Sequence, residues 1–130
     1  MFDHITLRVG DLHKSKAFFA AVLAPLGYKM LREKADSAGF AIEDVDGKRD
    51  FWIHVGDASQ QPHSFSCLGF GAPSKRAVDD FYAAGLAAGG RDNGAPGYRP
   101  EYHRGYYAAF VLDPDGHNIE AVFVDPTSPV

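Results

Sequence analysis

The segment FFAAVLAPLG, residues 18–27, recurs as FYAAGLAAGG at residues 81–90, and six of the ten positions are identical. The same offset of 63 residues lays His4–Val9 on residues 67–72 without a gap, and apolar residues fall at matching alternate positions. Self-similarity at a fixed spacing is the sign of a repeated structural unit. The chain is therefore predicted to contain two related half-domains.

The first half, residues 1–60, is predicted to run strand, helix, strand, strand, strand. Residues 4–9 alternate apolar and polar side chains, which is the period of a strand with one buried face. Asp11 then suits the N-cap of a helix whose apolar residues recur at helical spacing until Gly27 ends it. The later strands of this half are expected at residues 28–33, 40–45 and 51–55.

The second half, residues 61–130, repeats this order after a polar linker at residues 56–63. Residues 92–97 are rich in glycine, asparagine and proline and are predicted to form a long loop that could serve as a lid or a binding loop. The DPDG sequence at residues 113–116 has the proline and glycine of a turn, so its flanks are predicted to pair as a closing hairpin. The other expected elements are a strand at residues 65–70, a helix over residues 74–89, and hairpin strands at residues 106–112 and 118–124.

Charge and composition exclude several classes of protein. Thirteen Lys and Arg stand against 17 Asp and Glu, a net charge of −4 without any long run of one sign, which argues against a nucleic-acid or anionic-membrane partner. Cys67 is the one cysteine, so an intrachain disulfide is excluded. The sequence has no apolar stretch typical of a membrane span or a signal peptide. We expect one compact domain, residues 1–130, in the cytoplasm.

The repeat and the ending FVLDPDGHNIE, residues 110–120, resemble the vicinal oxygen chelate superfamily. Glyoxalase I, fosfomycin-resistance proteins, extradiol dioxygenases and bleomycin-resistance proteins belong to it. The resemblance covers essentially the whole chain and implies an α+β fold of two tandem βαβββ units. Their mixed sheets would curl into an incomplete barrel around a cavity, with the helices outside. It also implies a homodimer, and a metal ion that chelates two adjacent oxygens of a small substrate.

The resemblance places metal ligands on the first and last strands of each unit. His4 and Glu120 match a histidine and a carboxylate position. Cys67 stands where a histidine is common. Because thiolate suits zinc better than iron with oxygen, Zn, Ni or Mn is favoured over Fe as the implied ion. The fourth position falls on Trp52 or His54: an offset of 66 residues aligns His54 with Glu120, whereas an offset of 68 aligns Trp52 with it.

Other residues are candidates for contact with a substrate. Glu120, if buried, must be paired, bound to a metal or hydrogen-bonded, and it could act as a general base. Arg8 is expected on the same strand face as His4, where it could hold a carboxylate or phosphate of a ligand or form a salt bridge. Aromatic side chains suit a planar or apolar ligand. The predicted ligand-contacting set also includes Trp52, Tyr102, His103 and Tyr107.

Two functions follow from this sequence. The first is a divalent-metal-dependent lyase or isomerase, in which an ion held by His4, Glu120 and either Cys67 or His54 polarises adjacent substrate oxygens. The alternative is a metal-free protein that binds and sequesters a small aromatic compound or antibiotic, which the incomplete ligand set favours. Metal content separates the two.

Overall fold

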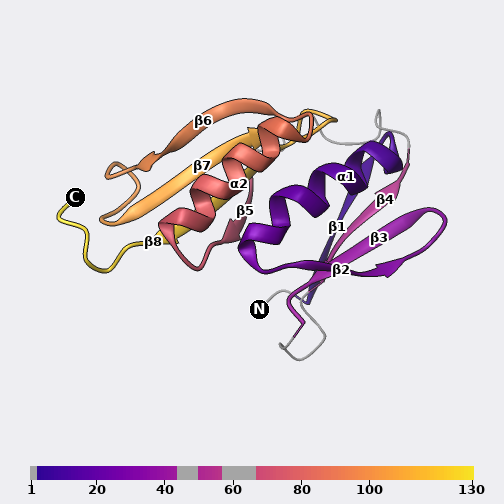
Figure 1. Cartoon of the computed structure of the whole chain (residues 1–130), viewed down its shortest axis with the longest axis horizontal. Helices are drawn as coiled ribbons and strands as arrows, with labels where there is room; N and C mark the ends of the chain where they lie inside the picture. Colours follow the sequence, from indigo (N-terminus) through magenta and orange to yellow (C-terminus); the bar gives the residue numbers. More distant parts are fainter. Residues whose placement is uncertain (1–2, 44–49, 57–66) are drawn as a thin grey trace.

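The computed structural model describes residues 3–43, 50–56 and 67–130. It contains two four-stranded mixed sheets, with strand orders β1-β4-β3-β2 and β5-β8-β7-β6, and each unit contributes one main helix (Figure 1). The sheets curl without closing into a barrel, so the predicted α+β architecture of two βαβββ units is confirmed. The elements are β1 His4–Val9, α1 Leu12–Leu23, the 3-10 helix η1 Ala24–Leu26, β2 Lys29–Glu33, β3 Ser37–Ala41, β4 Asp50–Val55, β5 Leu68–Gly71, α2 Lys75–Ala87, β6 Arg91–Tyr98, β7 Tyr106–Leu112 and β8 Asn118–Val124.

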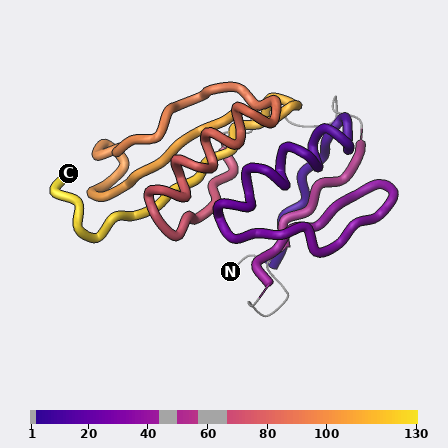
Figure 2. Tube along the Cα trace, viewed as in Figure 1, coloured from indigo at the N-terminus to yellow at the C-terminus, as the bar shows by residue number. Residues whose placement is uncertain are grey.

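The two units share one topology, and Figure 2 follows the chain through both of them. In each unit the first strand pairs in parallel with the last strand: β1 with β4, and β5 with β8. The remaining neighbours are antiparallel. The predicted linker at residues 56–63 and the boundary between residues 60 and 61 lie almost wholly outside the described residues, so the half-domain limits stay a prediction.

Both helices begin where the sequence places a capping side chain. The Asp11 carboxylate accepts a hydrogen bond from the Lys14 backbone N–H at 3.1 Å, and the Ser74 hydroxyl accepts one from Ala77 N–H at 3.1 Å. Such side chains satisfy backbone donors that a helix leaves unpaired at its start. After α1 and η1 the chain reverses at Gly27, whose φ of +92° favours glycine. The helix predicted after Asp11 therefore forms, with its last turn as a 3-10 helix.

Two predicted elements differ from the structure. Residues 92–97, predicted to be a loop, lie within β6, which pairs with β7 through register shifts around Gly94. The shifts let a glycine-rich segment remain in the sheet, so these residues are not a lid, and the open loop is residues 99–105. Strand β3 begins at Ser37, earlier than the predicted 40–45, and residues 44–45 of that prediction lie outside the described part of the chain.

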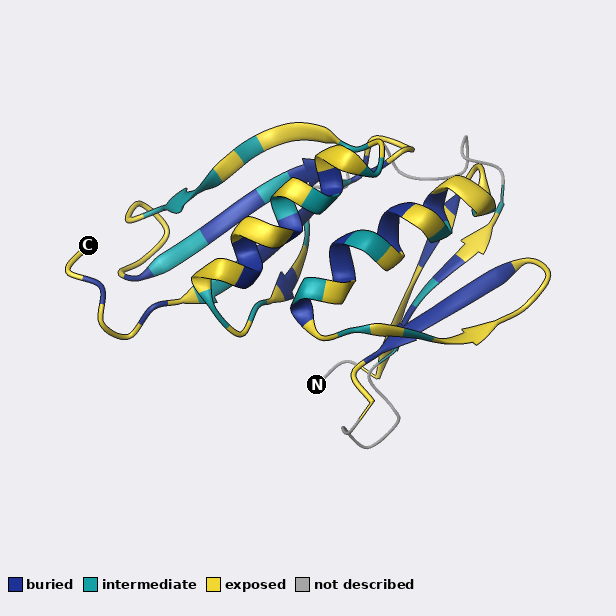
Figure 3. Cartoon of the chain, in the orientation of Figure 1, coloured by how far each residue is buried: buried dark blue, intermediate teal, exposed yellow. Residues whose placement is uncertain are grey.

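The core lies between the helices and one face of each sheet. Phe18 and Phe81, the equivalent residues of the repeat, are both fully buried, and α1 and α2 lie side by side (Figure 1). Figure 3 shows the buried residues on the facing sides of helices and sheets. A Cβ at Gly90 would lie 2.6 Å from the Phe18 ring, so the repeated glycine at this point lets the second unit approach α1. No described helix is long and apolar enough to cross a membrane.

Candidate functional site

Each sheet has one face turned away from its helix, which we call its open face. On β1, Leu7 and Val9 are buried beneath α1, whereas His4, Thr6 and Arg8 alternate with them and are exposed. On β8, Ile119 and Ala121 face the core. Side chains alternate along a strand, so Glu120 belongs to the open face of the second sheet.

The strand register identifies the counterpart of Glu120. Glu120 pairs with Gly69 in the second sheet, and Trp52 pairs with Thr6 in the first. Thr6 and Gly69 are equivalent at the repeat offset of 63 residues. Trp52 is therefore the structural equivalent of Glu120, and His54 lies two residues further along β4. The alternative that the sequence left open is resolved in favour of the aromatic residue.

Glu120 is buried and both of its carboxylate oxygens accept hydrogen bonds. The Tyr106 hydroxyl donates to Oε2 at 2.5 Å, and the Cys67 thiol donates to Oε1 at 3.2 Å. A buried carboxylate is costly unless such donors stabilise its charge. A Cβ at Gly69 would lie 3.0 Å from Oε1, so the absence of a side chain there leaves room for the carboxylate. We call Glu120, Cys67 and Tyr106 the Glu120 cluster.

The Glu120 cluster holds its two donors in their protonated forms. Burial, followed by the hydrogen bond and the negative charge of Glu120, raises the pKa of the Cys67 thiol from 9.0 to about 12. The same causes, in the same order, raise the pKa of Tyr106 well above its usual range. Cys67 is therefore a neutral thiol at neutral pH in this arrangement.

The loop after β6 covers Tyr106 with aromatic side chains. The rings of Tyr102 and His103 each pack edge-on against the Tyr106 ring, with centroids 5.1 Å and 5.0 Å away. Tyr102 is 57% exposed, so this layer is also open to solvent. Two of the predicted ligand-contacting residues are thus brought next to the Glu120 cluster through Tyr106.

Tyr107, which the sequence analysis placed in the ligand-contacting set, points the other way. Its hydroxyl donates to Asp79 on α2 at 2.7 Å, and its ring packs edge-on against Tyr98. Burial and then this hydrogen bond raise its pKa to about 12. The neighbouring Tyr106 occupies the open face instead. The alternation of side chains along β7 could have predicted this orientation. Ala109 and Val111 face the core, and Tyr107 lies on the same face of the strand.

The open face of the first sheet has a different character. A hollow of about 260 Å³ there is lined by His4, Thr6, Lys34, Ser37, Trp52 and His54. The Trp52 ring lies against Gly39, where a Cβ would come within 3.0 Å of it, and Lys34 Nζ lies 5.5 Å from the ring centroid. Both predicted histidines already have partners: His4 Nδ1 lies 2.9 Å from Asp3, and His54 Nε2 lies 3.2 Å from Asp36. Arg8 pairs with His54 in the strand register.

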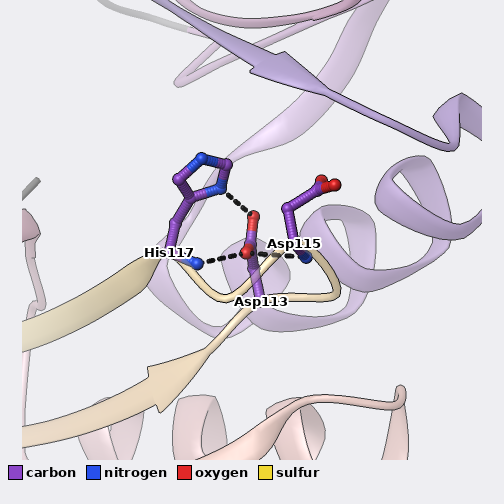
Figure 4. Close-up of side chains that lie close together, drawn as sticks. All are labelled: Asp113, Asp115 and His117. Carbon is purple, nitrogen blue, oxygen red and sulfur yellow. Dashed lines mark hydrogen bonds and ion pairs between the residues drawn. The ribbon is translucent and has the colours of Figure 1, made fainter. Parts of the chain in front are cut away.

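The predicted metal ligands lie outside the one close group of metal-ligating atoms found among the described residues. Within the described residues, only Asp113, Asp115 and His117 bring three potential donor atoms within 4.8 Å of one another, and none of His4, His54, Cys67 and Glu120 belongs to that group (Figure 4). The metal-ligand set expected around Glu120 therefore stays a prediction.

The Asp113, Asp115 and His117 group is a candidate metal site by proximity, but its hydrogen bonds describe a closed turn. Asp113 Oδ1 accepts from the backbone N–H groups of Asp115 and His117, and its Oδ2 lies 2.8 Å from His117 Nδ1. Asp115 Oδ1 accepts from Gly10 N–H at 3.1 Å, which ties this turn to the first unit. The hydrogen bond to Asp113 raises the pKa of His117, and burial opposes it. These hydrogen bonds give Asp113, Asp115 and His117 a structural role in the turn at residues 113–117.

Comparison with known proteins identifies the family. The family model described as "Glyoxalase/Bleomycin resistance protein/Dioxygenase superfamily" matches residues 1–121. A glyoxalase/bleomycin resistance protein from Albidiferax ferrireducens T118 is 33% identical, with a TM-score of 0.76 over 93% of this chain and 96% of that one. No curated protein matches significantly.

A second solved structure shows the same fold at lower identity. It is a mutant of the fosfomycin resistance protein FosX from Listeria monocytogenes, crystallised with Mn(II) and 1S,2S-dihydroxypropylphosphonic acid, and it is 22% identical. Its TM-score is 0.68 over 94% of this chain and 88% of that one.

Proposed function

We propose that this chain, which belongs to the Glyoxalase/Bleomycin resistance protein/Dioxygenase superfamily, binds a small organic molecule on the open face of its second sheet without a metal ion. The observation that carries the proposal is the state of Glu120, each of whose two oxygens already accepts a hydrogen bond, one from a phenol and one from a thiol. Trp52 at the equivalent position of the first unit supports it, because an indole supplies a stacking surface and no ligand atom for a metal.

The chemistry of the cluster defines what it would bind. Each Glu120 oxygen accepts one hydrogen bond and keeps a further lone pair, so the carboxylate would accept another hydrogen bond from a ligand N–H or O–H group. The rings of Tyr102 and Tyr106 would contact a planar part of the same ligand. An aromatic compound with a polar hydrogen-bond donor is the class of ligand that this face suits.

A divalent-metal-dependent lyase or isomerase is the second candidate. It is supported by the sequence resemblance, which matches His4 and Glu120 to a histidine and a carboxylate position of the superfamily, and by the Mn(II) named for the FosX structure. In that function Glu120 would ligate the ion, and the ion would polarise adjacent oxygens of the substrate. Each Glu120 oxygen already accepts one hydrogen bond, from Cys67 or Tyr106, so the ion would bind through the remaining lone pairs or displace one of these donors.

Metal content and ligand binding separate the candidates. Untagged protein would be dialysed against Mn, Zn, Ni or ferrous salts and analysed for metal. It would also be screened against aromatic compounds by NMR, through the ring signals of Tyr102 and Tyr106 beside Glu120. Metal-free binding predicts a saturable ligand signal that Glu120→Gln removes and Glu101→Gln, an exposed charge control, keeps. One tightly held ion per chain, lost in both His4→Ala and Glu120→Gln, would overturn it in favour of the enzyme.

The association state and location complete the proposal. A homodimer would be consistent with exposed apolar side chains such as Ile5 and Val124 on the strands, and sedimentation analysis tests it. A cytoplasmic location fits the protonated free thiol of Cys67, since thiols persist in reducing compartments.

A further inference from the structure

A second hollow lies between the two units, and Gly69, which borders the Glu120 cluster, is one of its lining residues. It has a volume of about 290 Å³ and is bordered by β1, the start of β4, and β5. Its floor is aromatic: the Phe70 ring meets Tyr28 edge-on at 5.6 Å and Phe51 edge-on at 5.3 Å. Ile5 and Leu68 supply aliphatic walls. We call this hollow the inter-unit cleft.

The rim of the inter-unit cleft is acidic. Asp3 and Asp50 line it together with His4, and among the described residues that line it none is a lysine or an arginine. The Asp3 carboxylate lies 2.9 Å from His4 Nδ1 and its side chain is 72% exposed. Two carboxylates above an aromatic floor produce a negative potential at an apolar surface.

We propose that the inter-unit cleft binds a small organic cation that carries an apolar or aromatic group. The Tyr28 ring lines the cleft and is half-buried, so it can attract a cation, and carboxylates at the rim add to this attraction without the cost of full burial. The apolar part of the ligand would lie against Ile5, Leu68 and Tyr28, the lining side chains that remain accessible, where it leaves water. An anion of the same shape would be repelled by Asp3 and Asp50.

This site does not depend on the function proposed for Glu120. The Gly69 backbone lies between the inter-unit cleft and the Glu120 cluster. A Cβ at Gly69 would point to Glu120 on the open face, whereas Phe51 and Phe70 point to the core side of their sheets. β1 and β5 are both edge strands of their sheets and flank the cleft, so a second copy of the chain is the competing occupant.

The test is a titration of the full chain with benzyltrimethylammonium, and with phenylacetate as the anionic comparison. Binding would be followed by NMR through the backbone amides of Gly69 and Gly71, which line the cleft. Asp50→Asn should weaken the cation about threefold through loss of one charge. Ile5→Trp should block it, since Ile5 is 37% exposed and a larger ring can fill the cleft without disturbing the core.

Asp80→Asn is the matched control, because it removes the same charge from an exposed site on α2, where its carboxylate lies 3.9 Å from Arg76. Saturable cation binding that weakens in Asp50→Asn and Ile5→Trp, but not in Asp80→Asn or Glu120→Gln, supports the site. Equal binding of phenylacetate, or equal loss in Asp80→Asn, would overturn it. An Ile5→Trp variant that dissociates a dimer in sedimentation would instead assign the cleft to a second copy.

Discussion

Replacing Glu120 by glutamine should make Cys67 react faster with thiol reagents. The thiol lies 3.2 Å from the Glu120 carboxylate, and its pKa is raised to about 12 by burial first and by Glu120 second. At pH 8 such a thiol is ionised in about one molecule in 10,000. Glutamine keeps the shape and the burial but removes the negative charge, so we expect the rate of alkylation to rise about tenfold.

The assay is alkylation by iodoacetamide at pH 8, followed by intact mass. Because the chain has a single cysteine, each adduct reports on Cys67 alone. Tyr106→Phe is the control, since it disturbs the same cluster but leaves the carboxylate in place, and its rate should not exceed that of the wild type. A folded Glu120→Gln protein that reacts at the wild-type rate would show that Glu120 does not hold the thiol, and the Glu120 cluster would have to be abandoned.

Three further predictions concern the frame around the site. The pKa of His117 is raised by its hydrogen bond to Asp113, so the stability from this pair is complete below the unfolded pKa of about 6.5 and is lost as pH rises through the folded pKa; melting temperatures across this window should vary less in His117→Gln. Gly105→Ala should cost about 2–4 kcal/mol of unfolding free energy in urea titrations, because φ is +79° and a Cβ would collide with the Asp125 backbone carbonyl. Gly71→Ala is the control, since its Cβ would meet no atom within 4 Å, and it should change the unfolding free energy by less than about 0.5 kcal/mol. Tyr107→Phe should lose about 1 kcal/mol in the same titrations yet leave ligand binding near Glu120 unchanged, and a loss of ligand binding would contradict its placement against α2.

The sequence was sufficient for the fold because its signals were local and repeated. The hairpin strands at residues 106–112 and 118–124 and the capped start of α2 match the structure, since alternation, turn residues and caps act over a few residues. The prediction of a loop at residues 92–97 was wrong because this segment pairs with β7, which is a tertiary contact. Register shifts around Gly94 keep the segment in the sheet despite its turn-forming composition.

The site was predicted less completely because it depends on strand phase and register. The sequence identified Glu120 as a candidate, but it named Tyr107, which packs against α2, and not the adjacent Tyr106, which lies beside Glu120. The choice between Trp52 and His54 needed the pairing of β1 with β4, because two offsets fit the sequence equally well. Whether the predicted metal ligands lie close together depends on distances between strands, and a local sequence pattern does not encode those distances.

The two units kept their buried face and diverged on their open face. Phe18 and Phe81 are equivalent and equally buried, whereas Thr6 faces Trp52 in one sheet and Gly69 faces Glu120 in the other. These changes are coupled in the second sheet, because the carboxylate needs the space that glycine leaves. Packing constrains the first set of residues, since any volume change in a dense core is costly. The open faces carry no such constraint, so one duplicated frame can present an indole on one side and a buried carboxylate on the other.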